Sequence, residues 1–135
     1  MEIHDSSVDH ITMENGIAVI HFPCVYIHQS EGKPTQDDGT FWAQEAILRI
    51  GDAQIEGTFS VAKQVWGGDI VYLYDGSLRL DDVISDDLIP IPLNMAAEVE
   101  LAMECCGETV RIRGTSVHLE LIGEARFVEE YKAKG

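Results

Sequence analysis

The sequence predicts a single all-β domain of about nine antiparallel strands, arranged as a β-sandwich or as a barrel. Apolar residues recur with a period of two rather than 3.6, which is typical of strands with one buried face. Turn signals arrive about every 8–12 residues, and no segment predicts a helix longer than two turns. A chain of 135 residues has the usual size of one domain, so residues 1–135 are treated as one unit.

In the first half of the chain, turn residues divide the strands. Asn15-Gly16 is a strong signal for a β-hairpin, because both residues tolerate the positive φ of a tight turn. Pro23 cannot donate a ladder hydrogen bond and predicts an edge, a bulge or a strand break. Residues 29–39 form a polar loop, and Gly51-Asp52 a turn. The strands expected here are 8–13, 17–22, 25–28, 40–50 and 54–61.

Residues 95–105 show the clearest alternation in the second half. Apolar side chains at every odd position alternate with Glu98, Glu100 and Glu104, which predicts a strand with one acidic, solvated face. We expect cross-strand ion pairs between these glutamates and Arg111 and Arg113. Turns are expected at Asp75-Gly76, at 106–108 and at Gly114-Thr115, so that 95–122 holds three consecutive strands. The strands expected here are 70–74, 77–80, 95–105, 109–113 and 116–121.

Two stretches are less regular. The pairs Asp81-Asp82 and Asp86-Asp87 flank a short apolar stretch, and Pro90 and Pro92 follow. Proline restricts the backbone, so residues 88–93, which contain both prolines, are expected to form an extended connection or an edge strand. Residues 126–135 are compatible with a short C-terminal helix or a last strand.

The charge excludes several classes of function. The chain holds 24 Asp and Glu against 9 Lys and Arg, a formal net charge of −15. An anion gains no counterion release on nucleic acid and is repelled by anionic membranes, so neither partner is expected. No Lys or Arg occurs in the first twenty residues, which is atypical of a targeting segment, and no apolar run is long enough to span a bilayer.

Three cysteines, two of them adjacent at Cys105 and Cys106, are typical of reduced thiols in a cytoplasmic protein. The charge favours a soluble monomer or small homo-oligomer.

Two histidines are weak candidates for a metal site. His10 and His21 lie at equal distances from the Asn15-Gly16 turn, so the hairpin register places them opposite each other. Facing imidazoles could hold a transition metal, with Asp9 or Cys24 nearby. The alternative is two surface or half-buried histidines with no ligand role. Since the chain contains no recognised metal-ligand spacing, the sequence favours that alternative and predicts no metal and no cofactor.

The expected loops hold the candidate binding residues. Acidic pairs without nearby basic residues offer a surface for a basic partner, and their oxygens also suit Ca²⁺. Trp66 lies in an expected loop, where tryptophan can anchor a partner. The candidate binding residues are Asp37, Asp38, Trp66, Asp81, Asp82, Asp86 and Asp87.

The opening residues carry one resemblance. Ile3-His4-Asp5-Ser6, followed by Val8, Ile11 and a strand pair, resembles the start of small bacterial β-rich domains of unknown or immunity function that open with a His-Asp-Ser stretch. The resemblance covers about fifteen residues and implies a small intracellular bacterial domain that neutralises a toxin.

We therefore expect a cytoplasmic, non-enzymatic interaction module that binds a basic protein, with an immunity protein as one form of it. No nucleophile elbow or other catalytic motif is present. The alternative is a small-molecule or carbohydrate-binding β-sandwich, with Trp42, Trp66, Tyr72 or Tyr74 lining the pocket.

Overall fold

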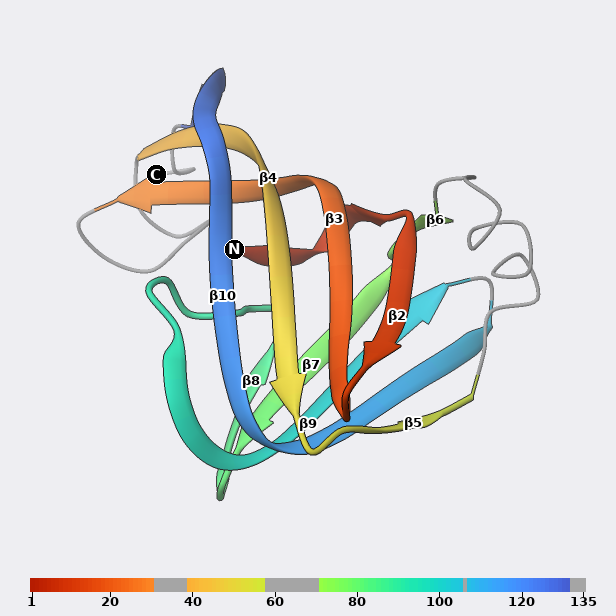
Figure 1. The fold of residues 1–135 in the computed structure, drawn as a ribbon. Helices are drawn as coiled ribbons and strands as arrows, with labels where there is room; N and C mark the ends of the chain where they lie inside the picture. The colour runs from red at the N-terminus through yellow and green to blue at the C-terminus, as the bar shows by residue number, and fades with distance from the viewer. Residues whose placement is uncertain (31–38, 58–70, 106, 132–135) are drawn as a thin grey trace.

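One antiparallel sheet of ten strands curls into a half-barrel (Figure 1). The computed structural model describes residues 1–30, 39–57, 71–105 and 107–131. The all-β prediction is confirmed, but all ten strands belong to one sheet rather than to the two sheets of a sandwich. No helix occurs within the described ranges, and none there is long and apolar enough to cross a membrane.

The strands follow one another along the chain with mostly short connections. They are β1 (Glu2–Val8), β2 (His10–Glu14), β3 (Ile17–Ser30), β4 (Gly39–Gly51), β5 (Gln54–Glu56), β6 (Val71–Tyr72), β7 (Asp75–Leu80), β8 (Val83–Asp86), β9 (Asn94–Cys105) and β10 (Glu108–Tyr131). Their order in the sheet is β6-β1-β3-β4-β10-β9-β7-β8. In addition, β2 pairs with β3 and β5 pairs with β10.

The predicted N-terminal hairpin is present. Asn15 and Gly16 join β2 to β3 with φ values of 53° and 79°, the left-handed conformation of a tight hairpin turn. The register of β3 against β4 shifts between Phe22 and Val25, so Pro23 lies at a bulge, one of the three outcomes predicted for it.

The predicted turn at Gly114-Thr115 is wrong. β10 runs without a turn from Glu108 to Tyr131 and shows only a register shift against β9 between Gly114 and Ser116. A Cβ atom at Gly114 would overlap the Gly51 carbonyl and the Ile50 side chain of β4. Gly114 is therefore a close-approach position inside a strand, and glycine serves there because it has no side chain.

The strand pairing predicted for 70–80 is also wrong. Asp75-Gly76 begins β7 rather than forming a turn, and β6 pairs with β1. The tight turn lies at Asp81-Asp82, where Leu80 faces Val83 and Asp81 has a φ of 53°. Asp tolerates this left-handed conformation better than most residues. Residues 83–86 form the edge strand β8, which was not among the expected strands, whereas the proline-containing residues 88–93 form the connection to β9, one of the two alternatives expected for them.

The alternative of a C-terminal helix is wrong over residues 126–131. These residues continue β10 and pair with β4 as far as Tyr131 opposite Gly39. Residues 132–135 lie outside the described part of the chain. The ladder to β4 supplies partners for the backbone hydrogen-bonding groups, which outweighs the helical spacing of Phe127 and Tyr131.

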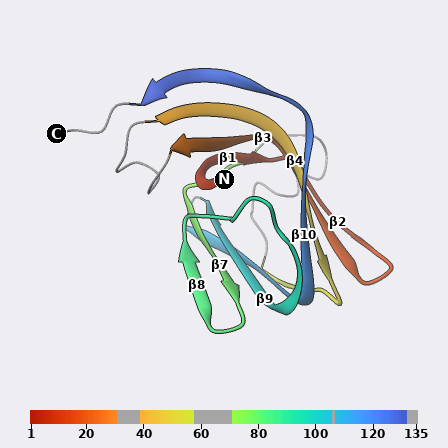
Figure 2. The ribbon, with the colours of Figure 1, turned by 90° about the vertical axis from the view of Figure 1, so that its left-hand side faces the viewer.

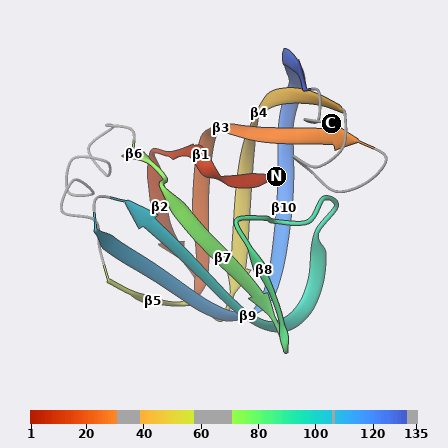
Figure 3. The same cartoon turned by 180° about the vertical axis from the view of Figure 1, so that it is seen from behind.

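The curl buries one face of the sheet against itself (Figure 2). The fully buried side chains of the central strands, all at 0% exposure, include Ile20, Leu48, Ile50, Met103 and Ile112. Two backbone hydrogen bonds join the N-terminal residues to the segment after β8. The Ile3 N–H donates to the Asp87 carbonyl at 2.8 Å, and the Ile89 N–H donates to the Met1 carbonyl at 2.9 Å. The segment after β8 therefore ties the N-terminal strand to the β7–β9 side (Figure 3).

Replacing Gly114 tests the close approach of β10 to β4. Gly114→Ala is expected to lower the free energy of unfolding by about 2 kcal/mol, because the new Cβ meets backbone that cannot move without distorting the ladder. Gly16→Asn is the control, since the Gly16 site is open and asparagine adopts positive φ readily. Urea unfolding of both variants measures the difference, and a Gly114→Ala protein as stable as the wild type would contradict the proposed packing.

Candidate metal centre and acidic hairpin

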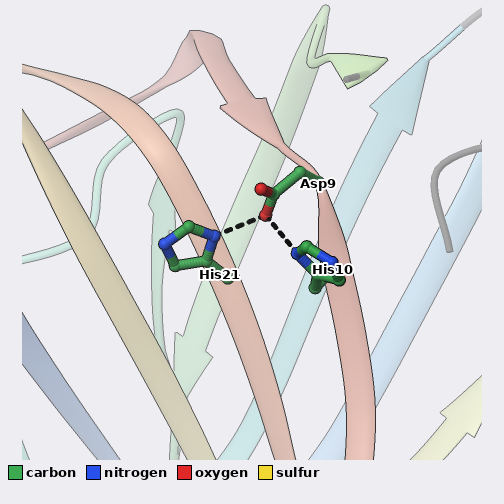
Figure 4. Close-up of side chains that lie close together, drawn as sticks. All are labelled: Asp9, His10 and His21. Atoms are coloured by element: carbon green, nitrogen blue, oxygen red, sulfur yellow. Dashed lines mark hydrogen bonds and ion pairs between the residues drawn. The ribbon is translucent and has the colours of Figure 1, made fainter. Parts of the chain in front are cut away.

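The register predicted for the first hairpin is confirmed at its histidines. His10 of β2 lies directly opposite His21 of β3, and their ring centroids are 6.0 Å apart. Figure 4 shows both rings with the Asp9 carboxylate between them. The side chains are 52% exposed for His10 and 24% for His21, so the pair lies on the outer face of the sheet.

Asp9 reaches both histidines because it interrupts two strands. β1 and β2 both pair with β3, and Asp9 lies at the break between them, where its backbone N–H donates to the His21 carbonyl. One carboxylate oxygen, Oδ1, lies 2.5 Å from His21 Nδ1 and 2.9 Å from His10 Nδ1. The two imidazoles therefore share a single oxygen atom.

Glu45 of β4 completes the surroundings of His21. Its Oε2 lies 2.6 Å from His21 Nε2, so each ring nitrogen of His21 faces a carboxylate. Glu45 reaches this position opposite the bulge of β3, where Phe22 pairs with Ala46 but Val25 pairs with Gln44. Glu45 is not among the residues predicted from the sequence, because the register of β4 on β3 depends on that bulge.

The two carboxylates favour the protonated imidazole. Burial alone would lower the pKa of His21, but the hydrogen bonds and charges of Glu45 and Asp9 outweigh it and raise that pKa. Burial likewise opposes ionisation of Asp9, yet the contacts with His21 and His10 lower the pKa of Asp9. Asp9 and His21 therefore behave as an ion pair on the weakly acidic side of neutrality.

The same atoms have the spacing of a metal site. One ligand atom each from Asp9, His10 and His21 lies within 4.8 Å of the other two. Cys24, the other candidate neighbour, is not part of this group. No other group of three potential ligands lies so close together in the described ranges, so the aspartates after Leu80 do not converge on one point.

Four of the predicted binding residues lie on one hairpin. With Asp75, they form what we call the acidic hairpin, which consists of Asp75, Asp81, Asp82, Asp86 and Asp87 on β7, β8 and their ends. Asp81 accepts a hydrogen bond from the Glu98 backbone and Asp87 from that of His4, and none of the five is paired with a described Lys or Arg. The other candidates, Asp37, Asp38 and Trp66, lie outside the described residues.

Each arginine side chain that the structure describes forms an ion pair with a glutamate of the same chain. Glu100 of β9 contacts Arg79, Arg111 and Arg113 at 3.3–3.9 Å, which confirms the predicted cross-strand ion pairs for this glutamate. Arg113 also contacts Glu56, and Arg49 contacts Glu120. The described arginines thus pair with Glu56, Glu100 and Glu120, and none of them contacts a carboxylate of the acidic hairpin.

Two hollows lie beside the acidic hairpin. One of about 420 Å³ is acidic, and its lining includes Asp75, Asp86 and Glu104. The other, of about 620 Å³, is lined by Tyr72, Leu73, Tyr74, Glu104, Cys105, Gly107 and Thr109. Tyr72 and Tyr74, two of the residues proposed to line a pocket, are largely exposed there.

Comparison with known proteins adds no relative. No protein-family model, no curated protein and no solved structure matches the chain. The resemblance of the opening residues to immunity-type domains therefore stays a prediction.

The Asp9–His21 ion pair predicts a pH-dependent stability. Because the pKa of His21 is raised above its usual 6.5, its contribution is complete below pH 6.5 and is lost as the pH rises through the folded-state pKa. Because the pKa of Asp9 is lowered, its contribution is present above 3.8 and lost in stronger acid. The pair therefore stabilises the metal-free protein most between these two values.

Urea unfolding of the chelator-treated wild type and of His21→Gln tests this window. The free energy of unfolding of the wild type is expected to exceed that of the variant at about pH 5.5. This difference should be larger than the difference near pH 9 by up to about 1 kcal/mol, since exposed ion pairs contribute little more than that. Glutamine does not titrate, so it removes the pH dependence at this site alone. A wild-type advantage that is constant or grows toward pH 9 would contradict the assignment.

Proposed function

We propose that this protein binds a basic protein partner through the acidic hairpin and performs no catalysis. The observation that carries the proposal is the distribution of ion pairs. Arg49, Arg79, Arg111 and Arg113 are each paired with a glutamate elsewhere on the surface, whereas the five aspartates of the hairpin have no described basic partner. A complementary cationic surface on a partner would supply the positive charge that these aspartates do not find within the described chain.

The shape of the hairpin supports a protein as the partner. Val83 and Ile84 at the start of β8 are 67% and 63% exposed, and carboxylates flank them on both sides. Apolar contact surrounded by charge is the usual composition of a protein interface. The adjacent acidic hollow has room for a lysine or arginine side chain among Asp75, Asp86 and Glu104.

The same charge supports the exclusion of nucleic acid and anionic membrane as partners. An immunity protein that neutralises a cationic toxin is the narrower form of this proposal, supported by the resemblance of residues 3–6. Both partners of such a complex would meet in the cytoplasm.

Neutralising two carboxylates of the hairpin tests the interface. The side chains of Asp82 and Asp86 are exposed and make no hydrogen bond or ion pair with the described residues, so Asp82→Asn/Asp86→Asn should fold normally. Wild-type protein is expected to capture a basic protein from source lysate at low salt and to release it near about 0.5 M salt, where the Debye length is short. The double variant should lose most of that capture.

A matched variant separates this surface from net charge. Glu14→Gln/Glu124→Gln also removes two exposed carboxylates, but from β2 and from the distal part of β10. It should retain the captured partner. Equal loss in both variants would indicate non-specific attraction, and the absence of any salt-sensitive basic partner would remove the proposal.

We propose small-molecule or carbohydrate binding as a second candidate, on the strength of the tyrosine-lined hollow. Its volume of about 620 Å³ lies within the range of ordinary ligand pockets. Tyr72 and Tyr74 offer exposed rings on which a sugar or another flat apolar surface could stack. Glu104 and Thr109 supply polar groups at the same hollow.

Thermal denaturation against a panel of mono- and oligosaccharides tests this candidate. A ligand is expected to raise the melting temperature by the same amount at low and high salt, because stacking is little screened. Tyr74→Ala should abolish that rise. Met13→Ala, which truncates an exposed apolar residue on β2, serves as the control. A rise that persists in Tyr74→Ala would place the ligand elsewhere.

A further inference from the structure

We propose that Asp9, His10 and His21 bind a divalent transition-metal ion, with Zn²⁺ as the best match, on the outer face of the β2–β3 hairpin. The proposal is independent of the acidic hairpin, because the β1–β2 junction and the β7–β8 turn lie apart in both Figure 2 and Figure 3.

The three ligand atoms lie close together. Asp9 Oδ1 lies 2.9 Å from His10 Nδ1 and 2.5 Å from His21 Nδ1, and all three atoms lie within 4.8 Å of each other. Two ligands of a tetrahedral zinc ion lie about 3.3 Å apart, since each is at about 2.0–2.1 Å from the metal. Small rotations of the three side chains therefore open the group enough to admit the ion.

The backbone around the ligands is well supported. His10 and His21 face each other across a regular antiparallel ladder, and the backbone N–H of Asp9 donates to the His21 carbonyl. Two of the ligands, His10 and His21, thus come from paired strands, and Asp9 comes from the single-residue junction between β1 and β2, which is hydrogen-bonded to β3. Sites built on such elements keep their geometry better than sites built on loops.

Glu45 is the second observation that points to a metal. Histidine ligands in metalloproteins characteristically donate their other ring N–H to a carboxylate, which fixes the tautomer and raises the basicity of the ligating nitrogen. Glu45 Oε2 lies 2.6 Å from His21 Nε2 and occupies this position. His21 is then oriented to bind through Nδ1, the nitrogen that faces Asp9 and His10. Glu45 acts here as a positioning residue.

The ligand set selects the class of metal. Two imidazole nitrogens and one carboxylate oxygen suit Zn²⁺ and its neighbours, whereas Ca²⁺ and Mg²⁺ prefer oxygen ligands. Three protein ligands leave one position of a tetrahedral ion unfilled. His10 is 52% exposed, so that position faces solvent and is accessible to an exogenous ligand.

Calorimetric titration of the chelator-treated full chain with ZnCl₂ tests the proposal. We expect one site per chain with a defined affinity. His10→Gln and His21→Gln should each weaken binding by more than about 100-fold, which exceeds the effect of an outer-shell change. Glu45→Gln should weaken it by about 10–100-fold, as expected of a positioning residue. His118→Gln is the matched control, because His118 lies outside the group and should leave the affinity unchanged.

Two further readouts exclude other zinc sites. Excess Ca²⁺ should not displace Zn²⁺, since displacement would indicate binding to surface carboxylates. The Co²⁺ derivative should show the visible bands of a four-coordinate ion without a thiolate charge-transfer band, which would indicate a cysteine site. The proposal is overturned by absent zinc uptake, by displacement with Ca²⁺, by a thiolate band, or by wild-type affinity in His10→Gln. His10 is exposed, so that variant remains informative even if His21→Gln unfolds.

Discussion

The structure depends on one constraint, which is that a single sheet must cover its own apolar face. The described chain has no helix and no second sheet to pack on that face. The alternation of apolar and polar residues puts most of the apolar side chains of the long strands on one side, so the sheet buries them only by curling. β10 makes the curl possible, because its 24 residues pair with β9 on one edge and with β4 and β5 on the other.

Curling requires local departures from a regular ladder, and these departures create the candidate metal centre. The break at Asp9 lets β1 and β2 pair with different parts of the same strand β3. The bulge near Pro23 lets β3 bend while it stays paired with β4. The first irregularity directs a carboxylate toward His21 from one side, and the second brings Glu45 to its other side. Regular strands would have given His21 only its cross-strand neighbours.

This origin explains which parts of the centre were predictable. A two-residue turn at Asn15-Gly16 determines the whole register of its hairpin, so the His10–His21 pair followed from the sequence and is confirmed. Glu45 did not follow, because residues 31–38, rather than a two-residue turn signal, separate β3 from β4 in the sequence, and the bulge changes their register by a residue. Local turn chemistry determines local register, whereas contacts between strands that are joined by a long connection depend on the packed core.

The same distinction between local turn chemistry and long-range packing explains which parts of the fold were predicted from the sequence. Period-two alternation identified most strands, because it records which face is buried. Glycine was ambiguous, since Gly16 lies in a turn whereas Gly114 lies inside β10. What separates them is the neighbouring β4 backbone at Gly114, which a single sequence does not reveal. Asp81-Asp82 was not identified as a tight turn, although aspartate tolerates the positive φ found at Asp81.

The ion pairs show where on the surface the excess negative charge is left without a basic partner. Glu100 is contacted by three arginines on the β7, β9 and β10 face, so much of the positive charge of the described chain is concentrated around one glutamate. The carboxylates on β7 and β8 therefore have no described arginine partner at that edge of the sheet, where they contribute negative potential. β8 is a short edge strand, and its flanking charges oppose pairing with another acidic copy of the chain. The same negative charges that oppose self-association at this edge would attract a cationic partner.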